Sequence, residues 1–123
     1  MAEASEPTLR VTMLPRDTNA RGTIFGGVIL SHIDLAGGIA AARRAARNFV
    51  TRAMREVEFI APVYVGDVVS FYASVIREGK TSVTVKVSVA AERAKEPALV
   101  VKVTEAEVIY VAVDEAGNPI PLR

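Results

Sequence analysis

Apolar residues recur with two different periods along the chain, and these periods predict the order of its elements. Residues 8–13 (TLRVTM) alternate apolar and polar side chains, as a short half-buried strand does. Residues 14–26 contain proline, aspartate, asparagine and glycine, which predicts a loop. Residues 27–46 are apolar along most of their length and rich in alanine near their end, so we predict a long buried helix there.

Beyond the predicted helix the pattern has a period of two, which predicts four strands. Residues 51–61 alternate small or apolar side chains with charged ones, and residues 67–78 place one apolar set on a single face. The alternation is clearest in residues 83–90, where every second residue is valine. The last run, residues 98–113, loses its alternation near residues 105–107, where we expect a bulge or bend.

The short linkers make the predicted sheet antiparallel. Gly79 and Lys80 separate two of the strands, and a connection of that length permits only a hairpin. The order β–α–β–β–β–β is that of an α+β protein. One long helix of small residues on a curved antiparallel sheet of about five strands is the hotdog fold, to which we assign residues 1–123 as one domain. Residues 100–101 and 108–109 are apolar on both faces, which one helix cannot cover, so we expect at least a dimer.

Composition narrows the functional classes. The chain has 123 residues and a formal net charge of +1, which argues against a nucleic-acid binder. It has no cysteine and one histidine, so disulfides, thiol nucleophiles and Cys-dependent or His-cluster metal sites are excluded. The first residues lack the basic and apolar regions of a signal peptide, so we expect a cytoplasmic protein.

Asp34 is the first candidate for chemistry. It is the only formally charged residue within residues 22–42, and its place near the middle favours a buried helix over a membrane span. An unpaired buried charge is costly, so this carboxylate must be paired, protonated or facing a cavity. A carboxylate in an apolar pocket is a candidate general base or nucleophile. The alternative is a structural bridge to a backbone amide at a subunit interface.

Gly26 and Gly27 lead into the predicted helix, where free backbone N–H groups can hold an oxyanion. The alternative is a plain tight turn. Asp34 lies seven residues beyond Gly27, or roughly 10 Å along the axis at about 1.5 Å per residue. Because Gly27 and Asp34 of one chain cannot both reach the same substrate atom, we expect Asp34 to work with the loop of a second subunit.

Other polar residues in this region have structural interpretations. Asn19 lies in the loop, where asparagine usually bonds local backbone. His32 is about 200° round the helix from Asp34, so Ser31, His32 and Asp34 do not form a hydrolase triad. Gly37 and Gly38 lower helix propensity, which indicates close packing or a ligand there.

Five arginines and no acid lie between Leu35 and Arg55, at positions 43, 44, 47, 52 and 55. Cations near a helix C-terminus are stabilised by the helix dipole. A phosphate site is the alternative.

Several short motifs lie along residues 9–121. They are MLPRDTNARGTIFGG at 13–27, IDLAGG at 33–38, FIAPV at 59–63, VGDVV at 65–69, GKTS at 79–82, YVAVD at 110–114 and PIP at 119–121. Together they resemble the hotdog-fold acyl-CoA thioesterases, in particular the small bacterial acyl-CoA hydrolases related to the brain-type cytosolic enzyme. The combination of the first two motifs is specific, whereas each alone is less so.

The resemblance implies a thioester hydrolase of lipid metabolism with Asp34 as catalytic carboxylate and Asn19 as its partner from the other subunit. It implies a homohexamer built as a trimer of dimers. It also places Gly79, Lys80, Thr81 and Ser82 near the CoA arm of the substrate. No metal or cofactor is implied, and CoA enters only as part of the acyl-CoA substrate and the product.

We therefore predict hydrolysis of acyl-CoA to CoA and a carboxylic acid. Gly26 and Gly27 hold the carbonyl oxygen in this prediction, and Asp34 activates water or attacks directly. Two alternatives remain. One is a hotdog enoyl-CoA hydratase, which needs an Asp/His pair, and the other is a non-catalytic acyl-CoA-binding module. No nucleic-acid or membrane partner is expected.

Overall fold

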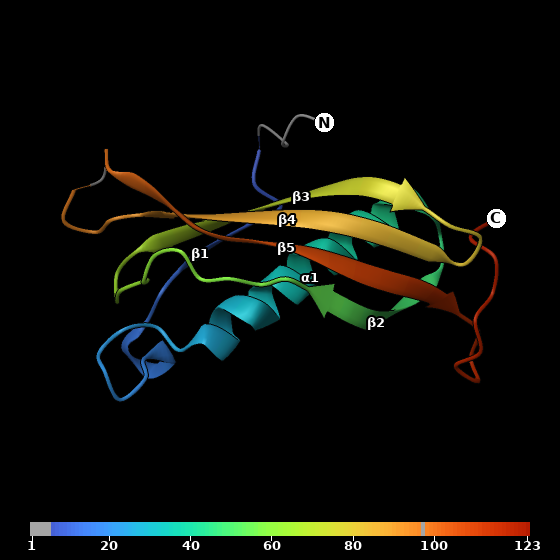
Figure 1. Cartoon of the computed structure of the whole chain (residues 1–123), viewed down its shortest axis with the longest axis horizontal. Coiled ribbons are helices and arrows are strands. Elements are labelled where there is room, and N and C mark those ends of the chain that lie inside the picture. Colours follow the sequence, from blue (N-terminus) through green and yellow to red (C-terminus); the bar gives the residue numbers. More distant parts are fainter. Residues whose placement is uncertain (1–5, 97) are drawn as a thin grey trace.

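A long helix lies along one face of a curved five-stranded sheet in the computed structural model, which describes residues 6–96 and 98–123 (Figure 1). The elements, in chain order, are β1 (Leu9–Thr12), the 3-10 turn η1 (Pro15–Asp17), α1 (Gly26–Arg44), β2 (Asn48–Arg55), β3 (Val68–Glu78), β4 (Ser82–Glu92) and β5 (Val100–Val113). The helix begins and ends within two residues of the predicted bounds.

All neighbouring strands in the sheet are antiparallel, in the order β1-β3-β4-β5-β2. The predicted α+β hotdog architecture is confirmed. β2 follows the helix and pairs only with β5, so it forms one edge of the sheet and β1 forms the other. A strand at an edge presents unpaired N–H and C=O groups that can bind a further strand.

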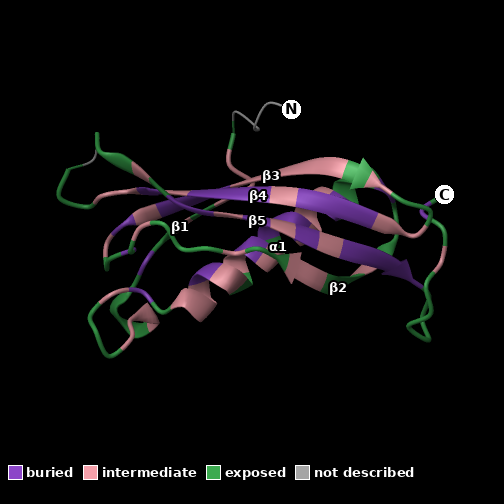
Figure 2. Ribbon diagram, in the orientation of Figure 1, coloured by how far each residue is buried: buried purple, intermediate pink, exposed green. Residues whose placement is uncertain are grey.

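The core lies between the helix and the facing side of the sheet, as Figure 2 shows by its buried residues. The valines that alternate along β4 are all buried, namely Val83, Val85, Val87 and Val89. Ile29, Ile33 and Ala36 of α1 pack onto them at helical spacing. Across the described ranges, no helix is long and apolar enough to span a membrane.

Two predicted strand details were wrong. The predicted strand over residues 51–61 begins earlier, at Asn48, and ends at Arg55, because Glu56 takes a positive φ of 50° and the chain leaves the sheet. The irregularity expected at residues 105–107 lies earlier, where Val103 is an extra residue in the pairing of β5 with β4. This bulge turns both Val103 and Thr104 into the interior, and the Thr104 hydroxyl donates to the carbonyl of Glu58 at 2.6 Å.

A buried ion pair holds the segment between β2 and β3. The side chain of Asp67 is 2% exposed and accepts hydrogen bonds from Arg93 Nη1 at 2.6 Å and from the N–H of Tyr64 at 2.9 Å. The same guanidinium donates to the carbonyl of Pro62 at 2.9 Å and lies over the ring of Tyr64. Because buried charges are stable only when paired and bonded, this pair fixes the course of residues 62–67.

Candidate active site

Asp34 faces a groove between the helix and the edge of the sheet. This groove, called the Asp34 groove below, has a volume of about 490 Å³. It is lined by Asp34, Leu35, Gly38, Ile39 and Ala42 of α1, by Arg47, Asn48, Phe49 and Thr51 on or next to β2, and by Tyr110 of β5. The only carboxylate in this lining is that of Asp34, which therefore faces a cavity, one of the three alternatives that the sequence left open.

Two hydroxyl groups from the sheet reach the Asp34 carboxylate. Thr51 Oγ1 donates to Asp34 Oδ1 at 2.7 Å. The Tyr110 hydroxyl donates to the main-chain oxygen of Asp34 at 2.7 Å and lies 3.2 Å from Oδ1. Thr51 and Tyr110 are directly opposite one another in the pairing of β2 with β5, so their side chains lie on the same face of the sheet.

Gly37 makes room for Tyr110 against the helix. A Cβ atom at position 37 would lie 2.2 Å from the Tyr110 hydroxyl oxygen, whereas one at Gly38 would be 3.9 Å from the ring. Close approach is therefore the reason for glycine at position 37. Burial raises the pKa of the Tyr110 hydroxyl far above its usual value, and the charge of Asp34 and the hydrogen bond to it add to this effect. The hydroxyl consequently remains protonated and available as a donor.

A second groove lies at the N-terminus of the helix and is called the N-terminal groove below. It has a volume of about 340 Å³ and is lined by Thr23, Ile24, Gly26, Ile29 and residues 59–63. The first N–H groups of a helix have no acceptor within the helix, so Gly26 and Gly27 start α1 with donors that can serve a substrate oxygen. The structure therefore places Gly26 and Asp34 at two different grooves of one chain, with Gly27 next to Gly26 in the first turn of α1.

Asn19 is engaged in its own loop. Its Oδ1 accepts hydrogen bonds from the N–H groups of Arg21 at 2.8 Å and Thr23 at 3.3 Å, and its Nδ2 donates to Thr23 Oγ1 at 2.9 Å. These contacts are the local structural role of asparagine in a turn. The lining of the Asp34 groove does not include Asn19, so a single chain does not bring the two predicted partners together.

His32 points away from the carboxylate. Its Nδ1 donates to the carbonyl of Val28 at 2.8 Å, and its ring stacks on Phe71 of β3 with ring centroids 5.5 Å apart. Asp34 bonds instead to residues of β2 and β5. The expectation that His32 and Asp34 cannot pair is therefore confirmed.

The predicted arginine group separates into different environments. Arg43 and Arg44 occupy the last turn of α1, where the helix dipole favours cations. Hydrogen bonds from Arg123 and Arg44 lower the pKa of Glu78. Arg47 alone lines the Asp34 groove, and its Nε donates to the carbonyl of Pro121 at 3.0 Å.

The hairpin Gly79–Ser82 lies beside the C-terminal segment that Arg47 contacts. The N–H of Leu122 donates to the carbonyl of Lys80 at 3.0 Å, and the N–H of Ala112 donates to that of Thr81 at 2.8 Å. The predicted CoA-arm residues and Arg47 are thus joined through Pro121 and Leu122.

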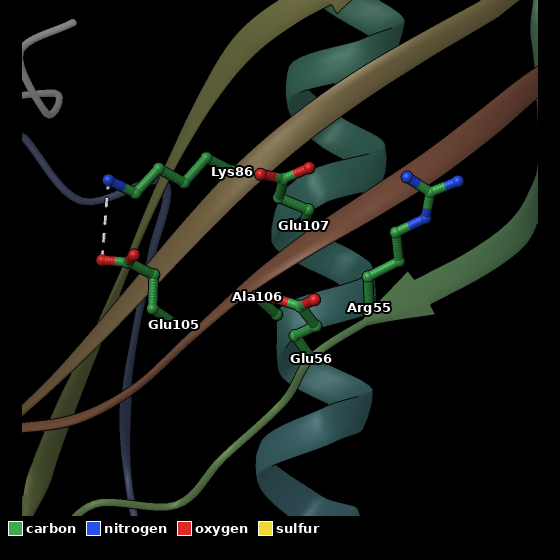
Figure 3. Close-up of a pocket in the computed structure, with 6 residues that line it drawn as sticks. All are labelled: Arg55, Glu56, Lys86, Glu105, Ala106 and Glu107. Carbon is green, nitrogen blue, oxygen red and sulfur yellow. Dashed lines mark ion pairs between the residues drawn. The ribbon is translucent and has the colours of Figure 1, made fainter.

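A third hollow, of about 350 Å³, is charged and lies on the other face of the sheet (Figure 3). It is lined by Arg55, Glu56, Lys86, Glu105, Ala106 and Glu107, and Lys86 pairs with Glu105 at 3.5 Å. Figure 3 shows the charged side chains in front of the sheet with α1 behind it. Within residues 6–96 and 98–123, no group of three or more His, Cys, Asp or Glu side chains is placed to hold a metal ion.

Comparison with known proteins assigns the family. A family model described as the Thioesterase superfamily matches residues 21–98, more than half of the chain. The chain belongs to the thioesterase superfamily. The acyl-CoA thioester hydrolase YciA of Salmonella typhimurium is 44% identical over 119 residues, covering 95% of this chain and 90% of that protein.

Solved structures of thioesterases have the same fold. A hexameric hotdog fold thioesterase of Campylobacter jejuni is 43% identical, with a TM-score of 0.90 over 97% of this chain and 91% of that chain. A hexameric broad specificity acyl-coenzyme A thioesterase, HI0827, is 35% identical, with a TM-score of 0.90 over 100% of this chain and 84% of that chain. The resemblance inferred from the motifs is therefore confirmed.

Two residues that bond to Asp34 were missed in the sequence. Thr51 and Tyr110 lie in strands where threonine and tyrosine are common, so their residue types carry no signal. The one available clue was the glycine at position 37, because it lowers helix propensity and so indicated close packing or a ligand at that turn.

Adjacent glycines give a matched test of this packing. We expect Gly37→Ala to lower the melting temperature, because its Cβ would overlap the Tyr110 hydroxyl. Gly38→Ala should leave the melting temperature unchanged or raise it, because alanine favours the helix by about 1 kcal/mol and meets only ordinary contacts. Thermal unfolding of both variants at one protomer concentration measures the difference. Equal melting temperatures for the two variants would contradict this account.

Proposed function

We propose that this chain hydrolyses acyl-CoA thioesters to CoA and a carboxylic acid. The names of the similar proteins, YciA and the broad specificity thioesterase among them, support the substrate class. The observation that carries the proposal is the Asp34 carboxylate, which is the only acid in the lining of the Asp34 groove. A carboxylate placed in this way serves as general base or nucleophile.

Hydrolysis needs a donor for the carbonyl oxygen and an acceptor for a proton. Backbone N–H groups of Gly26 and Gly27 stabilise the negative charge that develops on the carbonyl oxygen. In one route Asp34 takes a proton from water, whose oxygen attacks the carbonyl carbon. In the other route Asp34 attacks that carbon itself, and water hydrolyses the resulting anhydride. In both routes the C–S bond breaks and the CoA sulfur takes up a proton. The proposed reaction uses side chains, backbone amides and water, and no metal or cofactor.

A complete site in this proposal needs two copies of the chain. Gly27 and Asp34 are about 10 Å apart along one rigid helix, farther than the carbon and oxygen of one carbonyl group. The loop of a partner, with its Gly26 and Gly27, supplies the oxyanion donors for Asp34. Asn19 stands beside these donors and orients the carbonyl or the water.

The surface next to the Asp34 groove supports a homodimer. Among the described residues β2 has an unpaired edge, and Leu35 of α1 and Val50 of β2 are large apolar side chains exposed beside it, while Phe25 and Ile60 are exposed near the N-terminal groove. Apolar exposure beside an open strand edge marks an association surface. Because the similar solved thioesterases are hexameric, we propose a homohexamer, assembled as a trimer of such dimers. The expected cytoplasmic location stays a prediction.

One competing function is disfavoured by the structure. A hotdog enoyl-CoA hydratase needs an Asp/His pair at one acyl chain, whereas His32 is bonded to Val28 and stacked on Phe71. A non-catalytic acyl-CoA-binding module fits the same grooves, and turnover distinguishes it from the proposed enzyme.

The first test replaces the carboxylate. We expect Asp34→Asn to abolish the release of thiol from acyl-CoA, because asparagine neither takes up the proton nor attacks the carbonyl. The oligomer should survive in size-exclusion chromatography, because asparagine retains an oxygen that accepts from Thr51. A variant with more than about a tenth of the wild-type rate, a loss below about 1.4 kcal/mol, would show that Asp34 is not catalytic. Wild-type protein that binds acyl-CoA without turnover would instead favour the binding module.

A second test asks whether two chains share each site. Asn19→Ala and Asp34→Ala should each be inactive, whereas a mixture of the two should regain about a quarter of wild-type activity. Random exchange gives half of the dimers one copy of each variant, and in those dimers one of the two sites is intact. Mass spectrometry verifies the exchange of subunits. Asn19→Asp is the control for the structure of the loop, because its carboxylate still accepts hydrogen bonds from the N–H groups of Arg21 and Thr23. Absence of recovery after verified exchange would refute the shared site.

A third test concerns the CoA arm. We propose that Arg47 and the hairpin Gly79–Ser82, with Lys80, bind the phosphates of CoA. Arg47→Ala and Lys80→Ala should then raise KM for an acyl-CoA, and more strongly at low salt than at high salt. KM for the matching acyl-pantetheine should not change, and Lys95→Ala serves as the control cation. Equal KM values for acyl-CoA and acyl-pantetheine in the wild type would eliminate this phosphate site.

A further inference from the structure

We propose that Thr51 and Tyr110 are positioning residues for Asp34: Thr51 holds its Oδ1, Tyr110 holds its main-chain oxygen, and Oδ2 is left to act on the substrate. The inference rests on the proposed function, because it assigns a task to each oxygen of the proposed catalytic carboxylate. It adds two residues of the sheet to a mechanism that otherwise involves only the helix and the loop before it.

The hydrogen bonds divide the carboxylate into two unlike oxygens. Thr51 donates to Oδ1 at 2.7 Å, and Tyr110 lies 3.2 Å from the same atom. Within the part of the chain that the structure describes, no hydrogen bond to Oδ2 is made. Charge-assisted hydrogen bonds are stronger than neutral ones, so the hydrogen bond from Thr51 to Oδ1 fixes the rotation of the carboxylate.

The two hydroxyls contribute differently. Tyr110 has one hydroxyl proton, and its shorter contact, at 2.7 Å, is with the main-chain oxygen of Asp34. Tyr110 therefore fixes the position of the Asp34 backbone relative to β5. The Thr51 hydroxyl donates to Oδ1 and sets the side-chain rotation. Together they fix the carboxylate with respect to the sheet and not only to its own helix.

The strand register determines that both hydroxyls meet the same carboxylate. Thr51 pairs with Tyr110, and the next pair along the strands is Ala53 with Ile109, so Arg52 is an extra residue in β2. A shift of β2 by one residue would turn Thr51 to the opposite face of the sheet. Because Arg52 is an extra residue, the pairing of Ala53 to Arg55 with β5 is offset from that of Thr51, and Thr51 keeps its place opposite Tyr110. Bulges of this kind are frequent beside active sites.

Positioning matters because Asp34 is only partly buried and faces an open groove. A carboxylate free to rotate would spend part of its time with neither oxygen aimed at the reacting atoms. Catalysis requires the attacking atom within about 3.5 Å of its target in the correct orientation. Loss of a positioning hydroxyl should therefore reduce the rate of the chemical step and leave substrate binding intact.

The experiment compares Thr51→Val, Thr51→Ser and Tyr110→Phe with the wild type by steady-state kinetics on one acyl-CoA. Thr51→Val and Tyr110→Phe should each lower kcat by about tenfold or more, with KM within about twofold of the wild type. Thr51→Ser keeps the hydroxyl and should restore most of kcat. Matched controls are Thr84→Val and Tyr72→Phe, which lie on the other face of the sheet and should keep the wild-type kcat.

Each outcome decides the inference. A wild-type kcat in both Thr51→Val and Tyr110→Phe, with Asp34→Asn inactive, would overturn the positioning roles and leave the proposed function standing. An equal fall in kcat for Thr51→Val and Thr51→Ser, or a rise in KM alone, would show a merely structural role and would also overturn the inference. An active Asp34→Asn would overturn the proposed function itself, whatever the hydroxyl variants do.

Discussion

The hydrogen bond from the Tyr110 hydroxyl to the main-chain oxygen of Asp34 joins the sheet to the helix at the residue where the helix carries its only acid. That contact needs a helix without a side chain at position 37, and it needs β5 to lie beneath this turn of the helix. Because β5 lies between β4 and β2, the sheet supports the contact from both sides. The position of the carboxylate therefore depends on the whole sheet and not on a flexible loop.

Each chain has two separate grooves along its helix. The helix starts beside one groove with two glycines and faces another groove with Asp34 two turns later. A rigid helix keeps these features apart, so a second chain is the simplest way to combine donors with a carboxylate. The Asp67–Arg93 ion pair contributes at a distance, since it fixes the segment whose residues 59–63 line the N-terminal groove.

Much of the architecture could be predicted because it depends on local period and residue type. Alternating valines located β4, and the apolar run located α1 and made its single acid conspicuous. The Asp34 partners could not be predicted, because Thr51 is 17 positions away and Tyr110 is 76 positions away, and only the strand register brings them together. Residues 56–61 resembled a strand because an extended loop running beside β5 has the same alternation, and Ile60 even donates to the carbonyl of Val103.

The bulge in β2 also bears on how the length of this strand can change in evolution. Every residue of β2 other than Arg52 is paired with a residue of β5, and Arg52 lies between two intact pairs. Deletion of a residue between Asn48 and Thr51 would turn the side chains of the β2 residues before it to the opposite face of the sheet. Loss of Arg52 would leave each cross-strand pair as it is, so Arg52 is the one place in β2 where the chain can shorten without changing its neighbours.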